Sequence, residues 1–293
     1  SLMIKLFWNT HNQKNNPNDK EDRDLIWGEY HKNYSNKWIY EILNKINFQS
    51  INSDQELDNK DTLIIIDSSV EKKVEFYTKL KLLCSKIFLI HLGDETGIYD
   101  LSPVYGNCNH VWRTFCTGRY FNNKKVDCIA VGYKSGVEIN KKDLKRKYKW
   151  AFIGTPHKSS RHDLLFQLSS IQPSFSYKTE KFHKKIMDTE EMTQVLSQTS
   201  FLPCPNGFVH PETYRLYEAL ESGCIPIVEN AYKYYDRLFP DNPFLKIDKW
   251  IEAKEIINKW TEQKIIKKSE ECNFWWRKYK EKLQEDIKEK IKS

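Results

Sequence analysis

Short apolar runs alternate with amphipathic segments along the first half of the chain. An apolar run of about six residues predicts a buried strand, whereas apolar residues three and four apart predict a helix. Met3–Trp8, Leu63–Asp67 and Lys86–Leu92 are the clearest strands. Helices are predicted near Trp38–Ile46 and Val70–Cys84. Weaker strand signals lie at 48–51, 110–116 and 126–131. The segment 9–33 is polar and indicates a loop or short helices. Alternation of this kind is typical of a Rossmann-like half that runs to about residue 137.

The second half repeats the alternation after a basic stretch, Lys141–Lys149, which we interpret as a solvated linker. Strands are expected at 150–153 and 174–177, and helices from about Ser160, within 182–198, and at 232–239, 250–260 and 272–291. The predicted fold class is therefore α/β, with two Rossmann-like domains. The expected boundaries are 1–140, 141–270 and a closing helix at 271–293.

The stretch 197–230, SQTSFLPCPNGFVHPETYRLYEALESGCIPIVEN, has the clearest pattern in the chain. Its first apolar run is expected to stop at Pro203. A helix is expected to open at Pro211, which suits a first helical turn, and to end at Gly223. The run Cys224–Val228 then predicts a second strand. Strand, loop, helix and strand in this order form a βαβ unit, the building block of parallel sheets.

Charge and cysteine content indicate which partners and which cellular compartment to expect. The net charge is +7, with 47 basic and 40 acidic residues spread along the chain. Such a surplus favours solvated lysine-rich faces, or else an anionic substrate or a membrane surface. No apolar run reaches the roughly 18–20 residues of a membrane span, and the N-terminus lacks a signal-peptide pattern, so a cytoplasmic protein is expected, with peripheral membrane contact as an alternative. Seven cysteines without a C-x-x-C pair predict reduced thiols rather than disulfides or a zinc site.

Two loop-to-helix junctions in the second half carry residues suited to phosphate. One is Gly154 with Arg161, and the other runs from Gly207 through His210 and Thr213 to Arg215. Helix starts at the carboxyl ends of parallel strands bind anions through free backbone N–H groups. Glu218, one turn deeper, could accept hydrogen bonds from ribose hydroxyls. The alternative is that Arg215 and Glu218 form only a surface ion pair worth a few tenths of a kcal/mol.

The segment SFLPCPNGFVHPETYRLYEALESGCIPIV resembles the donor-binding motif of exostosin-type glycosyltransferases, which have the GT-B fold of two Rossmann-like domains around a cleft. Upstream, WAFIG followed by Arg161 is similar to the entry of that family into its nucleotide half. HLGDE, VWR and VGYKSG resemble a branch that includes ribitol xylosyltransferase-like proteins. Together these likenesses touch roughly residues 87–230.

The resemblance implies an inverting glycosyltransferase that uses a UDP-sugar donor. A glycan or lipid-linked acceptor is expected as its partner. It puts Thr213 and Arg215 at the diphosphate, Glu218 at the ribose, and Gly154 and Arg161 at a neighbouring loop.

Inversion needs a general base on the acceptor hydroxyl. Asp94 and Glu95, after a first-half strand, are the candidates, with Asp67 as the alternative; each could instead merely cap a turn. Arg113 could neutralise the diphosphate from the first half or form a structural ion pair.

Metal-dependent sugar transferases place a D-x-D motif after a strand. The chain has this pattern only in the polar loop at Asp22-Arg23-Asp24, so neither a metal nor another cofactor is expected. Two other functions remain open. The basic stretch KKDLKRKYK and the many aromatic residues could belong to a nucleic-acid-binding protein, although the sequence lacks the signature of a known module. The chain could also be a transferase-like scaffold that binds sugar without turnover.

Overall fold

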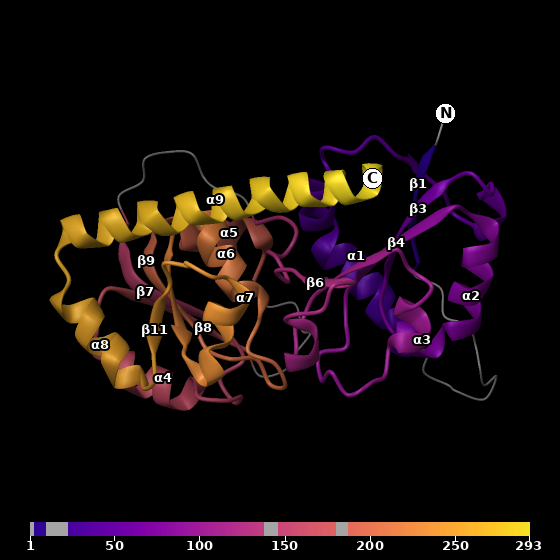
Figure 1. Cartoon of the computed structure of the whole chain (residues 1–293). Helices are drawn as coiled ribbons and strands as arrows, with labels where there is room; N and C mark the ends of the chain where they lie inside the picture. The colour runs from indigo at the N-terminus through magenta and orange to yellow at the C-terminus, as the bar shows by residue number, and fades with distance from the viewer. Residues whose placement is uncertain (1–2, 10–22, 138–145, 180–186) are drawn as a thin grey trace. The chain divides into compact units, whose positions relative to one another are not determined.

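The computed structural model describes residues 3–9, 23–137, 146–179 and 187–293, with the backbone alone for 23–31 (Figure 1). The chain divides into two compact units, one of residues 1–131 with 282–293 and the other of residues 132–281. Helix α9 (Glu262–Lys292) contributes its first part to the second unit and its last turns to the first. Both units are built on parallel sheets, which confirms the α/β class and the Rossmann-like halves.

The sheet of the first unit has the strand order β2-β1-β3-β4-β5-β6, and every neighbouring pair is parallel. All six residues of β3 are buried, as expected for an inner strand of a parallel sheet covered on both faces. The strands are β1 (Ile4–Trp8), β2 (Gln49–Ser50), β3 (Thr62–Asp67), β4 (Lys86–His91), β5 (His110–Arg113) and β6 (Val126–Cys128). The helices are α1 (Arg23–Ile42), α2 (Val74–Leu83) and α3 (Ser102–Tyr105).

Helix α1 begins earlier than the sequence predicts. The expectation of a loop or short helices over 9–33 is wrong from Arg23 onward, since one helix of 20 residues already starts there. Its apolar stripe lies near its end, where Trp38, Ile39 and Ile42 are fully buried. Once packing holds those turns, each further residue toward the N-terminus adds one backbone hydrogen bond, so a polar segment can join the helix without an apolar stripe of its own.

The sheet of the second unit has the order β11-β10-β9-β7-β8, again all parallel. Figure 1 shows α4 and α8 on one side of this sheet, and α5, α6 and the first part of α9 on the other. The strands are β7 (Tyr148–Gly154), β8 (Ser174–Lys178), β9 (Thr199–Cys204), β10 (Ile225–Glu229) and β11 (Leu245–Ile247). The helices are α4 (Arg161–Leu168), α5 (Thr189–Ser197), α6 (Tyr214–Ser222), α7 (Tyr234–Leu238) and α8 (Trp250–Lys259).

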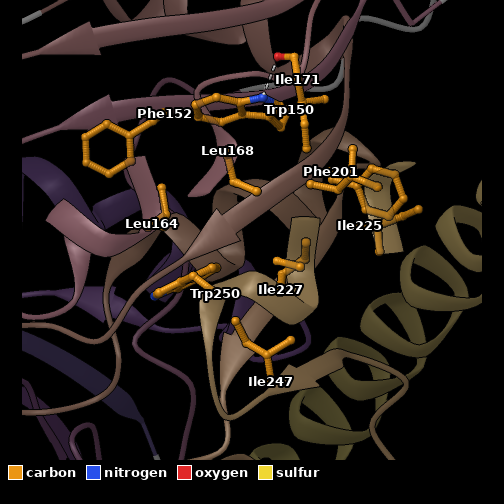
Figure 2. Close-up of a cluster of buried hydrophobic side chains, with 12 residues drawn as sticks. Trp150, Phe152, Leu164, Leu168, Ile171, Phe201, Ile225, Ile227, Ile247 and Trp250 are labelled. Atoms are coloured by element: carbon orange, nitrogen blue, oxygen red, sulfur yellow. Dashed lines mark hydrogen bonds between the residues drawn. The ribbon is translucent and has the colours of Figure 1, made fainter. Parts of the chain in front are cut away.

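The core of the second unit on the α4 and α8 side is a cluster of tryptophan, phenylalanine and branched aliphatic side chains (Figure 2). Trp150 on β7 is 3% exposed, and its indole N–H donates to the carbonyl of Ile171 over 3.0 Å. On the other face of the sheet, Trp276 of α9 packs against Tyr217 of α6, with 5.5 Å between ring centroids. Both faces of the sheet are therefore covered, and its inner strands β7, β9 and β10 carry the buried apolar runs.

Two boundaries in the 197–230 stretch differ from the prediction. Strand β9 continues through Pro203 to Cys204 rather than stopping at the proline. The pairing of β9 with β7 ends at Phe201. Pro203 has no backbone N–H, and it lies beyond the part of β9 that pairs with β7, so the strand tolerates it. Helix α6 begins at Tyr214, three residues after Pro211, because side-chain contacts hold Pro211 and Glu212 in the preceding turn. Its end at Gly223 (φ 74°) is as expected, in the left-handed conformation that glycine favours.

The basic linker is partly structural. Residues 138–145 lie outside the described residues, but Arg146 is not a solvated linker residue. Its guanidinium donates to the carbonyls of Leu196, Thr199 and Ser222, at 2.8, 3.0 and 2.8 Å. Two of these carbonyls lie at the ends of α5 and α6, where helix carbonyls lack partners and attract a cation. The sequence could not show this, because the three carbonyls come together only in the fold.

The prediction of reduced thiols is wrong for one pair, since Cys116 and Cys128 form a disulfide with a Cα–Cα distance of 5.5 Å. Strand β6 pairs with β5 so that Cys128 lies opposite Arg113, close to where the chain continues to Cys116. Parallel pairing thus brings together two cysteines twelve positions apart. The other five cysteines are buried and free. Within the described residues, no helix is both long and apolar enough to cross a membrane.

Candidate functional site

The second unit contains a topological switch point between β7 and β9. These strands are neighbours, but β7 continues through α4 to β8 on one side, and β9 continues through α6 to β10 on the other. Open α/β sheets bind ligands at the carboxyl ends of such a strand pair. The loops that leave this edge are Gly154–Ser160 and Pro205–Thr213. They and the helices that follow them carry all the second-half residues predicted to bind the donor.

Arg215 occupies the centre of this edge. Its Nη2 donates to the carbonyl of Ile153 over 2.8 Å, and its guanidinium lies 5.1 Å from the ring centroid of Phe152. Its Nη1 is buried, and within the described part of the chain it finds no acceptor. Gly154 leaves the space for this arrangement, because a Cβ atom there would lie 2.5 Å from Arg215 Nη2. The glycine and the arginine therefore depend on each other.

Arg161 brings a second guanidinium to the same edge. It is 7% exposed, and its Nη1 donates to the carbonyl of Thr155 over 2.8 Å. Its buried Nε also lacks an acceptor among the described residues. Burial and, next, the positive charge of Arg215 lower the pKa of Arg161 to about 10, while Glu229 opposes the shift. The two guanidinium groups repel each other, and each holds a buried N–H donor without an acceptor among the described residues. A bound anion would stabilise both groups.

Two helix starts add backbone donors to this edge. Thr213 is the N-cap residue of α6, with an extended backbone (φ −137°, ψ 165°), and its hydroxyl makes no capping hydrogen bond. Ser160 precedes α4 and likewise gives no side-chain cap. Its hydroxyl instead accepts the indole N–H of Trp250 over 2.8 Å. Neither N-cap side chain therefore caps its helix, and a helix start of this kind can bind phosphate oxygens through backbone N–H groups.

Glu218 is buried rather than on the surface. It is 8% exposed, so it does not form with Arg215 the surface salt bridge considered as the alternative. Burial raises the pKa of Glu218, while the charges of Arg215 and Lys134 oppose that shift. A buried acid beside cations can accept hydrogen bonds from a ligand's hydroxyl groups once the ligand excludes water.

The turn before α6 is held by a residue that the sequence reasoning missed. Glu212 is 2% exposed and accepts the hydroxyls of Tyr217 and Tyr234, the latter over 2.5 Å. His210, predicted to touch ligand, is 5% exposed, and its Nδ1 accepts the backbone N–H of Glu212. Gly207 is required by close approach, since a Cβ there would lie 2.5 Å from the carbonyl oxygen of His210. The two tyrosines were the available signal, but Tyr234 lies twenty-two positions from the glutamate, and the spacing alone does not bring both hydroxyls to one carboxylate.

In the first unit, the structure brings Asp94 and Arg113 together. Their side chains are fully buried, and both terminal guanidinium nitrogens of Arg113 donate to Asp94 Oδ2 over 3.2 Å. Arg113 also lies 4.2 Å from the ring centroid of Tyr120. This is the structural ion pair considered as the alternative for Arg113. Glu95, the other candidate base, is exposed on the loop after β4.

Asp67, the third acid considered as a base, is enclosed. It ends β3 and is 1% exposed, with an ion pair to Lys73 at 2.7 Å and a hydrogen bond from Tyr77 at 2.7 Å. Asn9, which follows β1, also donates to it over 3.3 Å. Burial raises the pKa of Asp67, although Lys73 opposes the shift. These contacts indicate that Asp67 has a structural role at the carboxyl edge of the first sheet, where it holds Asn9, after β1, and the start of α2.

Left-handed backbone conformations gather at the carboxyl edges of both sheets. Six of the seven non-glycine residues with positive φ in the described part of the chain follow β3, β4, β5, β7 or β10, namely Ser69, Asp94, Phe115, Ser159, Tyr232 and Lys233; the seventh, Asp241, precedes β11. Such residues cost about 1–3 kcal/mol each and are typical of functional loops. Among the described residues, no group of three or more His, Cys, Asp or Glu side chains could hold a metal ion. The Asp22-Arg23-Asp24 pattern lies outside the described side chains.

Comparison with known proteins gives one family. The model of the RXYLT1 C-terminal domain matches residues 133–293, which is more than half of the chain and includes the whole switch-point edge of the second unit. A comparison with curated proteins finds no match.

Proposed function

Because the chain belongs to the RXYLT1 C-terminal domain family, which makes it glycosyltransferase-like, we propose that it transfers a sugar from a UDP-sugar to a hydroxyl acceptor with inversion. The observation that carries the proposal is the pair of arginines at the switch point, each with a buried N–H group that has no acceptor in the described part of the chain. A diphosphate would supply the missing acceptors and neutralise the repulsion between the two guanidinium groups.

In the proposed mode of binding, the diphosphate lies against Arg161, Arg215, Thr213 and the N-terminal ends of α4 and α6. Glu218 accepts the ribose hydroxyls. The fixed guanidinium groups and helix starts stabilise the negative charge that develops on the departing UDP, so the proposed reaction needs no metal ion. The fold proposed for the whole enzyme is GT-B, and the proposed acceptor is a glycan or a lipid-linked glycan.

The proposed chemistry is a single displacement. A carboxylate takes the proton of the acceptor hydroxyl, the acceptor oxygen forms a bond to the anomeric carbon, and the bond from that carbon to the phosphate oxygen breaks. The electron pair leaves with UDP, and the sugar inverts. Of the two adjacent acids, Glu95 is the proposed base because its side chain is exposed. The carboxylate of Asp94 is buried against Arg113.

The test is calorimetric titration with UDP in the presence of EDTA. Arg215→Lys and Arg161→Lys keep the charge but lose the forked geometry of the guanidinium group, and each is expected to weaken UDP binding by roughly 10- to 150-fold, as for the loss of a hydrogen bond to a charged group. Arg277→Lys, at an exposed position of α9, is the matched control and should bind like the wild type. Absence of UDP binding, or equal affinity in all three variants, would refute the proposed site.

Turnover separates an enzyme from a scaffold. Release of UDP from a UDP-sugar, followed by NMR of the product anomer, should show inversion. UDP binding without any sugar transfer over a panel of UDP-sugars and acceptors would favour the scaffold alternative. Binding of single-stranded nucleic acid that falls steeply with salt, without UDP binding, would favour the nucleic-acid alternative.

A further inference from the structure

Phe208 is an exposed aromatic ring on a rigid support. It is 78% exposed and lies in the turn between Gly207 and His210. The close approach of Gly207 to the carbonyl of His210 makes this turn tight. The His210 ring packs edge-on against Tyr234, with 4.8 Å between the centroids, and its Nδ1 accepts the N–H of Glu212. The anchored histidine fixes the base of the turn, while Phe208 projects into solvent.

This ring lies next to the two-arginine site. The Nζ atom of Lys158 is 5.7 Å from the centroid of Phe208, within the range of a cation–π contact. Lys158 belongs to the loop after β7, and its carbonyl accepts the backbone N–H of Arg161 over 3.2 Å. The two loops of the switch point therefore meet at Lys158 and Phe208. The ring adjoins the loop that positions Arg161.

We propose that Phe208 is the stacking platform for the nucleobase of the donor nucleotide. This inference rests on the proposed function, because it needs a nucleoside diphosphate at the switch point. Such a ligand combines an anionic group with a flat, weakly hydrated ring, and this edge combines two guanidinium groups that hold buried, unused N–H donors with an exposed flat ring. Stacking on a rigid aromatic side chain costs little conformational entropy and works for any base, since every base has a π face.

The experiment compares UDP with inorganic pyrophosphate by calorimetry. Phe208→Ala is expected to weaken UDP binding by about 5- to 150-fold, which corresponds to about 1–3 kcal/mol, and to leave pyrophosphate binding unchanged. Phe208→Trp should retain UDP affinity because it keeps a stacking surface. Phe166→Ala is the matched control, since Phe166 on α4 is 76% exposed in the same unit and should leave both affinities unchanged. Arg215→Lys should weaken both ligands.

The outcomes separate the two proposals. If the wild type binds UDP and Arg215→Lys weakens it, but Phe208→Ala binds UDP as tightly as the wild type, the stacking role is refuted and the proposed function stands. A Phe208→Ala variant that loses affinity only for a UDP-sugar, and not for UDP, also refutes it, because the ring would then contact the sugar. If the wild type does not bind UDP, both proposals fall.

Discussion

Replacement of Gly154 by alanine tests the geometry of the donor site most directly. The φ angle of Gly154 is +151°, a conformation that residues with a Cβ rarely adopt, and the new Cβ would lie 2.5 Å from Arg215 Nη2. Real Cβ atoms do not come that close, so the guanidinium group must move. It can do so only by giving up its hydrogen bond to the carbonyl of Ile153 and its position at the ring of Phe152.

The expected effect has two parts. Backbone strain in the folded state should lower the free energy of unfolding by about 1–3 kcal/mol. For a domain of about 150 residues this corresponds to a fall in Tm of roughly 2–12 °C. Displacement of the Arg215 guanidinium should also weaken UDP binding by roughly 10- to 150-fold. The range is the same as for Arg215→Lys, because both changes remove the guanidinium N–H donor of Arg215 from the ligand.

The assays are differential scanning fluorimetry and calorimetric titration with UDP. Gly118→Ala is the control, because a Cβ at Gly118 would meet no atom within 4 Å. It should change the free energy of unfolding by no more than about 0.5 kcal/mol and leave UDP affinity as it is. A Gly154→Ala protein that binds UDP within about twofold of the wild type would refute the reasoning that Arg215 must occupy this position.

Two predictions concern the first unit. Asp94→Asn should destabilise the protein by about 3–5 kcal/mol, measured by urea unfolding, because it leaves the charge of buried Arg113 uncompensated. Glu95→Gln should keep wild-type stability but lower the rate of sugar transfer by about 10²- to 10⁴-fold. If Asp94→Asn instead kept stability and lost sugar transfer while Glu95→Gln lost stability, the two roles would be exchanged. Burial would raise the pKa of Asp127, but the hydrogen bonds and charges of His110 and Lys290 outweigh burial and lower this pKa to about 2. The ionised carboxylate therefore stabilises the fold above about pH 4, and this contribution is lost as pH falls through 2. Asp127→Asn should unfold at lower urea than wild type at pH 6, with a much smaller difference at pH 2, and an equal difference at both pH values would contradict this.

The candidate site was partly predictable because its signals are local. Gly154, Arg161, Gly207, Thr213 and Arg215 were identified from loop-to-helix junctions that the structure places at a single sheet edge. Sequence reasoning missed Glu212, whose tyrosine partners come from α6 and α7, and the orientation of Asp94 toward Arg113, nineteen positions away. A local pattern does not show which distant side chain will satisfy a buried charge.

The sequence by itself determined the class of fold, because apolar runs of strand length alternate with amphipathic helices and only a parallel sheet covered on both faces buries such runs. It also located the turn glycine at 223, where the chain needs a left-handed residue. Only the tertiary structure decided where helix α1 begins, that Pro203 remains in β9, that Arg146 holds three carbonyls and that Cys116 meets Cys128. Each of these features is stabilised by contacts between segments that are far apart in the chain. The order of the strands in the sheets determines which segments meet, and no single segment encodes that order.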